Sequence, residues 1–334
     1  MINQPSPLKE PVAEQSTTTP TQVSDPAGVL PPPPVSLQAT IDPEHPPWAQ
    51  PPWAGAIMAF FVWFVSVLCL VFVPLILVVP YVIYRMTAAS SQVVLTNLEN
   101  DKTFLFLSVL GVIPAHLLTF LIAYLVVTRG RNYPLGETLG LSWPPSWGPV
   151  KGVVICVLIG MALFGGGALI TQFFPGEKTQ LDLLIESSYG ARLVTALLAV
   201  VTAPLVEEII YRGILYPGIA GGFEWVIALF QPRNRARILG AAVAIAVVSL
   251  LFAGVHFVQY QKNLAVVGVI TLVSITLTVV RAYSRRLLPC LVIHLIFNGI
   301  QAVIMLLYPF LPKPETTPQP APAELLAFVL RLFS

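Results

Sequence analysis

Charged side chains are scarce in this chain of 334 residues. Asp, Glu, Lys and Arg together make up 10% of it, against about 25% in an ordinary soluble domain. Hydrophobic residues make up 56%, and the mean hydropathy is +0.79. This composition excludes a soluble globular protein and predicts a polytopic membrane protein.

Cysteine and basic clusters are rare as well. Cys69, Cys156 and Cys290 each lie alone in an apolar stretch, so we interpret them as small core residues and exclude a disulfide framework or a cysteine-ligated metal. The formal net charge is only +2, and no basic cluster indicates a nucleic-acid partner. The partners to expect are the lipid bilayer and a peptide or protein substrate.

Apolar segments fill most of the chain after residue 53. A spanning helix needs about 20 apolar residues, and seven segments meet this length or come close to it: 54–84, 104–128, 150–174, 191–220, 238–259, 264–280 and 287–308. An eighth span within 213–231 remains open. The sequence predicts an all-α polytopic bundle of about seven or eight spans. We expect an integral multi-pass protein of a bacterial-type cell membrane.

The two ends of the chain differ from this apolar domain, which covers 54–308. Residues 1–53 hold 14 of the 32 prolines, a composition that predicts a disordered tail. Trp48 and Trp53 are expected to be interfacial anchors where the tail meets the first span. A chain starting near His45 is therefore expected to fold. Residues 309–334 predict a Pro-rich linker and a short C-terminal helix.

One segment of the fourth span carries the largest concentration of charge within the apolar domain. Glu207, Glu208 and Arg212 follow fourteen consecutive uncharged residues. An ionised carboxylate at bilayer depth costs roughly 2.5–3.5 kcal/mol. Glu208 and Arg212 are spaced i,i+4 and can pair on a helix, whereas Glu207 is rotated about 100° away. We predict that Arg212 holds Glu208 and leaves Glu207 for chemistry; a buried structural ion pair is the alternative.

Three further polar side chains lie in later spans. His256 follows Phe252 by one turn in the fifth span, and His294 precedes Asn298 by one turn in the seventh. Intramembrane polar groups face the interior of a bundle, so the three helices are expected to converge on one polar pocket. His116, in the second span, is interpreted as a hydrogen-bonded packing residue.

These residue types permit more than one chemistry. A carboxylate beside a histidine can activate water, and a second histidine with an amide can stabilise an oxyanion. Glu207, His256 and His294 would equally supply three ligands for zinc. A transporter would need the same buried groups. The chain has neither Gly-x-Ser-x-Gly nor His-Glu-x-x-His, so it lacks the usual serine-hydrolase and zincin signatures.

The ordered set of motifs resembles a known family. Glu-Glu-x-x-x-Arg at 207–212, Phe-x-x-x-His at 252–256 and His-x-x-x-Asn at 294–298 are similar to the motifs of the CPBP family. Its members are the CAAX prenyl protease and bacteriocin-processing intramembrane endopeptidases, also called the Abi family. The resemblance covers about 150–308.

The resemblance implies an all-helical intramembrane endopeptidase. It implies that Glu207 and His256 activate water and that His294 and Asn298 stabilise the oxyanion, with Glu208, Arg212 and Phe252 in support. It leaves both a zinc enzyme and a metal-free glutamate enzyme open. A catalytically silent scaffold or immunity protein is the alternative function, beside the transporter. Whether the substrate is prenylated cannot be read from these residues.

Overall fold

The computed structural model describes residues 41–88, 91–307 and 310. The chain divides into two units, Met1–Ala39 and Thr40–Ser334, and all described residues belong to the second. The predictions for residues before 41 and for the short helix near the C-terminus lie outside the described residues.

The described part of the chain is helical throughout and contains no strand. Seven of its helical segments are long and apolar enough to cross a membrane: Pro52–Thr87, Lys102–Val127, Gly148–Phe173, Tyr189–Ile227, Arg233–Tyr260, Leu264–Ser284 and Leu288–Leu307. Each corresponds to one of the seven predicted segments. The region 213–231 contains no eighth span, because 213–227 continues the fourth helix. The prediction of an integral multi-pass all-α protein is confirmed.

The first two spans form one side of the bundle. A short 3-10 helix, η1 (Pro47–Ala49), precedes α1 (Pro52–Phe72), and a break at Pro74 separates α1 from α2 (Leu75–Ala88). Then follow α3 (Ser91–Asn97), η2 (Leu98–Asn100) and α4 (Lys102–Val127), which packs on α1 and α2. Asp101 caps α4 by accepting hydrogen bonds from the amides of Thr103 and Phe104. This cap satisfies two of the amides that a helix start leaves without partners.

The middle of the chain crosses to the other side of the bundle. The short helix α5 (Leu135–Leu139) leads to α6 (Gly148–Phe173). A short helix, α7 (Gln180–Ser187), lies between the third and fourth spans. It begins with a capping box formed by Thr179 and Asp182, which fixes its start.

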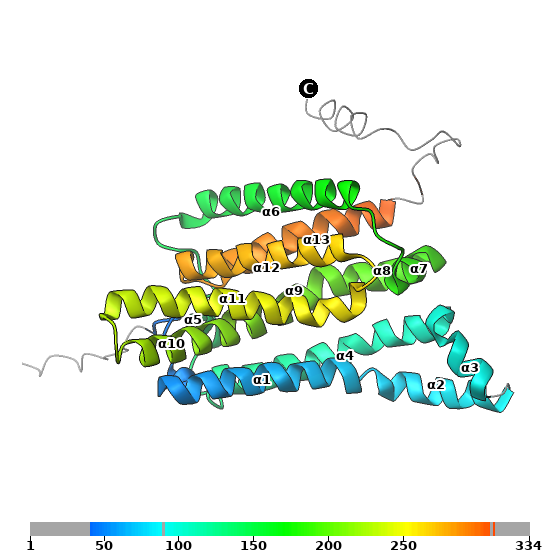
Figure 1. Ribbon diagram of the computed structural model, residues 1–334, viewed down its shortest axis with the longest axis horizontal. Coiled ribbons are helices and arrows are strands. Elements are labelled where there is room, and N and C mark those ends of the chain that lie inside the picture. The colour runs from blue at the N-terminus through cyan, green and yellow to red at the C-terminus, as the bar shows by residue number, and fades with distance from the viewer. Residues whose placement is uncertain (1–40, 89–90, 308–309, 311–334) are drawn as a thin grey trace, which may run out of the picture. The chain divides into compact units, whose positions relative to one another are not determined.

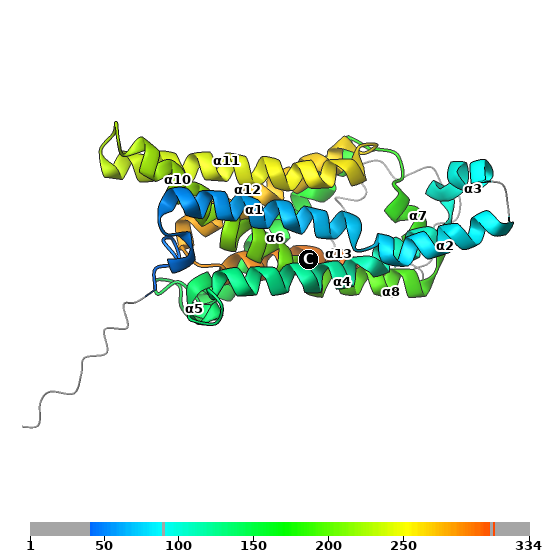
Figure 2. The same ribbon diagram turned by 90° about the horizontal axis from the view of Figure 1, so that it is seen from below.

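The fourth span is one continuous helix of changing pitch. It consists of α8 (Tyr189–Leu197), the π-helical η3 (Leu198–Thr202), α9 (Ala203–Glu208), the π-helical η4 (Ile209–Leu215) and α10 (Tyr216–Ile227). A turn at 228–232 joins it to α11 (Arg233–Tyr260), and the chain continues through α12 (Leu264–Ser284) to α13 (Leu288–Leu307). Figures 1 and 2 show α10 and α11 side by side, and α6 packs against α12 and α13.

Two apolar clusters hold these helices together. The larger one joins α1, α4, η4, α10 and α11, with Ile214, Leu215 and Val248 fully buried. The smaller one joins α6, α12 and α13 around Cys156, Leu277 and Ile293. The fourth span is central to the larger cluster. In its most apolar stretch of 18 residues, 44% of the residues are buried, a larger share than in any other span. The glutamate pair therefore lies on the most enclosed helix of the described bundle.

Residues 42–45, here called the N-terminal strap, pack against the ends of α10, α11 and α12. The Pro43 carbonyl accepts a hydrogen bond from the buried Arg281 (2.7 Å), and Glu44 pairs with Arg285 (3.1 Å). Trp48, expected at the membrane interface, is only 7% exposed and belongs to the larger core cluster, whereas Trp53 is 53% exposed. Part of the segment assigned to the tail is thus built into the bundle.

This packing changes the expected outcome of truncation. A chain starting at residue 40 keeps every contact of the strap, and we expect its melting temperature in detergent to equal that of the full chain. A chain starting at His45 lacks the Pro43 acceptor of Arg281. Leaving a buried charged donor without its acceptor costs about 1–3 kcal/mol or more, so its melting temperature should fall. Equal melting temperatures for the two truncated chains would contradict this role of the strap.

Candidate active site

Two prolines set the pitch of the helix that carries the glutamates. The residues that precede Pro204 and Pro217 donate their amides five residues back, Ala203 to Leu198 and Tyr216 to Tyr211. A proline has no N–H to continue this π-helical pattern. The carbonyls five residues before the two prolines, those of Ala199 and Arg212, therefore receive no hydrogen bond from a proline amide. Single π-helical turns inside α-helices are frequent at functional sites. Here they flank the six residues of α9, which ends in Glu207 and Glu208.

Glu208 and Arg212 form the predicted ion pair. Arg212 Nη1 lies 2.9 Å from Glu208 Oε1, and both side chains are 0% exposed. Arg212 Nη2 donates to the hydroxyl (2.8 Å) and the carbonyl (3.1 Å) of Ser274, and Nε donates to Thr278 Oγ1 (3.3 Å). Because Ser274 and Thr278 lie on α12, the pair joins the fourth span to the sixth.

His294 connects the two glutamates. Its Nδ1 lies 2.8 Å from Glu208 Oε1, and its Nε2 lies 3.8 Å from Glu207 Oε2. In the pairing of Nδ1 with the ionised Glu208 the carboxylate can only accept, so Nδ1 carries a proton. Glu208 thereby orients the imidazole so that Nε2 points toward Glu207. Glu207 itself is 20% exposed, in contrast to Glu208.

The structure places His256 level with Glu207 on the neighbouring helix. The Phe252 ring packs edge-on against Tyr211, with 4.8 Å between the ring centroids. The fourth span and α11 run antiparallel as a hairpin, with Glu207 one turn before Tyr211 and His256 one turn after Phe252. The two residues therefore lie at the same height, although no hydrogen bond joins them among the described residues.

The imidazole of His256 has one nitrogen engaged. Nδ1 donates to the carbonyl of Phe252 (2.9 Å), and the two rings lie 4.6 Å apart. A carbonyl only accepts, so Nδ1 carries the proton and Nε2 of the neutral ring keeps its lone pair. Phe252 also lies under the guanidinium of Arg212, 4.9 Å from the ring centroid. The aromatic ring thus packs between the ion pair and His256.

Asn298 reaches the fourth span one turn beyond His294. Its amide Nδ2 donates to the carbonyl of Ala199 (2.8 Å). Pro204, five residues later, has no N–H and cannot donate a hydrogen bond to this carbonyl. One of the two amide N–H groups of Asn298 is therefore used to complete η3, and the second is not needed there.

His116 is the residue near the site that the motifs did not indicate. It is hydrogen-bonded and 5% exposed, as predicted for a packing residue, with Nδ1 2.9 Å from Thr202 Oγ1. It also lies within range of a charge interaction with Glu207. A lone histidine and a lone threonine on separate helices give no sequence signal of this proximity.

The side chains present do not form the zinc site that the sequence left open. A catalytic zinc has three protein ligands, and no group of three His, Cys, Asp or Glu side chains in the described ranges is placed to hold one metal ion. Glu207 and His294 face each other, but His256 does not complete a triad with them. We therefore derive no step through a metal.

A comparison with known families identifies the segment that contains this site. Residues 189–300 match the family model described as type II CAAX prenyl endopeptidase Rce1-like. The chain carries an Rce1-like domain. The match covers about a third of the chain and includes all three motifs, so the predicted resemblance to the CPBP family is confirmed for this segment. No curated protein and no solved structure matches the chain.

The Rce1-like domain begins at a helix start and ends within a helix. It begins at Tyr189, where the fourth span begins, and ends within α13, two residues after Asn298. The domain therefore contains α8 to α12 and the part of α13 that bears the site. The first three spans, which lie before it, contribute His116 and the helices packed around it.

Proposed function

We propose that this protein is an intramembrane endopeptidase that hydrolyses a peptide bond with water activated by Glu207. The observation that carries the proposal is the line of contacts from Arg212 through Glu208 and His294 to Glu207. Arg212 and Glu208 are fully buried and held by hydrogen bonds, and the last member, Glu207, is partly exposed. A rigid support under an accessible carboxylate is the arrangement expected for a general base.

The distance between Glu207 and His294 suits a water molecule that contacts both side chains. At 3.8 Å the oxygen and the nitrogen are too far apart for a direct hydrogen bond, so one water molecule can bridge the two groups. Glu207 takes a proton from water, and the hydroxide oxygen bonds to the carbonyl carbon of the substrate. His256 Nε2 is free to accept the second hydrogen of the same water.

His294 and Asn298 supply the hydrogen-bond donors for the oxyanion in this proposal. With a proton on Nε2, His294 donates to the oxyanion that forms on the carbonyl oxygen, together with the second amide N–H of Asn298. When the oxyanion collapses, the C–N bond breaks and the amine leaves with the proton held by Glu207.

The position of the site in the bundle suits a bond near a membrane surface. His256 lies four residues before the end of α11 at Tyr260, which is about 6 Å along a helix. The turn that follows, around Lys262 and Asn263, closes this end of α11 and α12. By analogy with the Rce1-like family, the substrate we propose is a CAAX-type C-terminal peptide held at that depth.

Cleavage by the purified chain in detergent tests this function. The probes are two internally quenched peptides ending in a Cys-aliphatic-aliphatic-X sequence, identical except that one carries a farnesyl group on its cysteine. We expect cleavage after the cysteine, read as product mass, with no ion gradient present. If the protein cleaves neither peptide and no other peptide in a mixed-sequence library, the result would favour a transporter or a scaffold instead.

Chelation separates the metal-free scheme from the zinc scheme. Because the described side chains do not form a three-ligand site, we expect purified active protein to hold far less than one zinc per chain. Activity should survive dialysis against a strong chelator, whereas a catalytic zinc would be lost with the activity. Stoichiometric zinc that disappears in His256→Ala would show that His256 moves to join Glu207 and His294.

A further inference from the structure

We propose that Arg281 is a positioning residue for this active site, and that the N-terminal strap holds it in place. Arg281 lies at the end of α12, outside the three family motifs. It touches none of the proposed reacting groups. The kinetic part of this inference rests on the proposed function, and its structural part does not.

Arg281 is buried to an unusual degree for a cation. Its side chain is 0% exposed, and no carboxylate forms an ion pair with it among the described residues. Two backbone carbonyls accept its hydrogen bonds: that of Arg212 from Nε (3.1 Å) and that of Pro43 from Nη2 (2.7 Å). Nη1 has no hydrogen-bond partner in the described part. A buried cation is costly unless it is bonded, so Arg281 depends on these two carbonyls, beside the ring of Tyr216, whose centroid lies 5.7 Å from its guanidinium carbon.

The Arg212 carbonyl is available because of Pro217. In the π-helical pattern of η4 the amide of Tyr216 bonds to the carbonyl of Tyr211, and the next amide in the series would bond to Arg212. That position is Pro217, which has no N–H. A carbonyl left without a donor inside a bundle must find one elsewhere. Arg281 supplies it from α12.

The same device occurs at the other π-helical turn. Pro204 leaves the Ala199 carbonyl without its backbone donor, and Asn298 from α13 supplies the hydrogen bond. Two helix-interior prolines are thus each matched by a side-chain donor on a different helix. The two bonds hold the ends of the short segment that carries Glu207 and Glu208. Asn298 belongs to a family motif, whereas Arg281 performs the equivalent task without one.

The effect of Arg281 reaches the active site through Arg212. Arg281 holds the backbone of Arg212, whose side chain binds Glu208 Oε1 (2.9 Å). Glu208 in turn holds His294 Nδ1 and directs Nε2 toward Glu207. Each of these contacts is direct and buried, so a shift of the Arg212 backbone moves the imidazole. Placement errors of about 1 Å at reacting groups can cost about 10²-fold in rate.

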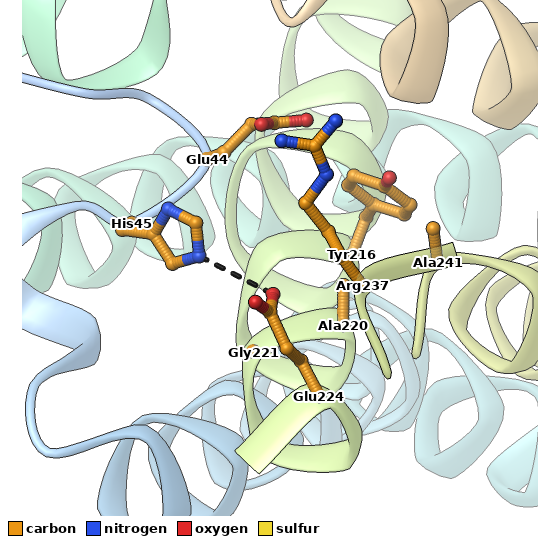
Figure 3. A pocket seen from close by; sticks show the side chains of 8 residues that line it. All are labelled: Glu44, His45, Tyr216, Ala220, Gly221, Glu224, Arg237 and Ala241. Atoms are coloured by element: carbon orange, nitrogen blue, oxygen red, sulfur yellow. Dashed lines mark hydrogen bonds and ion pairs between the residues drawn. The ribbon is translucent and has the colours of Figure 1, made fainter. Parts of the chain in front are cut away.

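The strap is fastened at two further points, which keeps the Pro43 carbonyl in place. Glu44 pairs with Arg285, and His45 bridges Asp42 (3.2 Å) and Glu224 of α10 (3.4 Å). Figure 3 shows His45 pointing toward Glu224 and the carboxylate of Glu44 beside the guanidinium of Arg237 on α11. Burial acts to lower the pKa of His45, but its bonds to Asp42 and Glu224 raise the pKa overall. A protonated ring can donate to both carboxylates.

Kinetics of Arg281→Met in the full chain test the positioning role. We expect kcat on the farnesylated peptide to fall roughly 10- to 100-fold, with KM unchanged within about twofold, because the substrate does not contact Arg281. Arg281→Lys keeps the buried charge but has one nitrogen in place of the two that bond to the carbonyls, and we expect it to fold and to show a smaller loss of kcat. Arg235→Met, on the exposed start of α11, is the matched control and should leave both constants unchanged.

A double variant distinguishes positioning from general damage to the fold. Pro217→Ala restores a backbone N–H for the Arg212 carbonyl, so Arg281→Met should cost much less kcat in that background than in the wild type. An equal loss in both backgrounds would overturn the inference. So would a loss confined to KM, or a full wild-type kcat in Arg281→Met.

A spectroscopic readout separates this inference from the proposed function. If the wild type cleaves none of the peptides, the proposed function fails, and the coupling is read from the ¹⁵N resonances of the His294 imidazole in detergent. These should shift in Arg281→Met and not in Arg235→Met, with the resonance assigned by its absence in His294→Gln. Unchanged His294 resonances in a folded Arg281→Met protein would overturn the inference whatever the activity.

Discussion

Glu207→Gln should abolish peptide cleavage while leaving the protein folded. Glutamine has nearly the same shape, and the side chain is partly exposed and bonded less tightly than its neighbour Glu208. Loss of a general base typically lowers the rate by about 10²–10⁴-fold. The measurement is kcat on the farnesylated peptide, with the melting temperature in detergent as the test of folding.

Glu137→Gln is the control for this variant. Glu137 is an exposed glutamate on α5, outside the three motifs and the N-terminal strap. We expect it to keep the wild-type kcat. Wild-type cleavage by Glu207→Gln would show that another group activates the water, and a comparable loss in Glu137→Gln would show that the effect is not specific to the site.

Arg212→Met should have the largest effect on stability of any single substitution at the site. It leaves Glu208, at 0% exposure, without its arginine partner and with only His294 in contact, and it removes four hydrogen bonds, one to Glu208 and three to α12. Breaking a buried ion pair by removing one partner costs about 3–5 kcal/mol. The measurement is equilibrium unfolding in mixed detergent–SDS micelles, supported by the yield of folded protein.

Two comparisons sharpen this second prediction. The double variant Glu208→Gln with Arg212→Met removes the uncompensated charge, so it should be more stable than Arg212→Met alone. Arg285→Met breaks the more exposed pair with Glu44, in which the arginine is 48% exposed, and should cost about 0–1 kcal/mol. If the double variant is the less stable of the two, the cost does not come from the stranded carboxylate.

The number and extent of the spans were predictable from the sequence because they depend on local composition. Each observed span overlaps its predicted segment, since about 20 apolar residues cross a bilayer regardless of what they pack against. The pairing of Glu208 with Arg212 was predictable for the same reason, because an i,i+4 spacing on one helix places both side chains together. The convergence of the three motifs was a hypothesis, supported by the expectation that polar groups face inward.

Other features depend on contacts between helices and could not be derived from spacing. The sequence contains Pro204 and Pro217, but it does not show which carbonyl each proline leaves without a backbone donor. Nor does it show which distant side chain donates a hydrogen bond to that carbonyl. That choice depends on the π-helical register and on where α12 and α13 pack, which brings Asn298 to Ala199 and Arg281 to Arg212.

The position of residues 42–48 also depended on contacts between distant parts of the chain. Composition alone assigned residues 42–45 and Trp48 to a tail, yet they pack against the bundle, because Arg281 needs the Pro43 carbonyl and the core accepts the indole of Trp48. The sequence by itself determined a helical protein of about seven or eight spans with a paired Glu208 and a neighbouring Glu207. Only the tertiary structure decided that His294 faces Glu207, that His256 lies level with it and that the Pro43 carbonyl binds Arg281. Hydrophobic length and i,i+4 pairing act within one segment, whereas a buried donor is satisfied by whichever carbonyl the packing brings within reach.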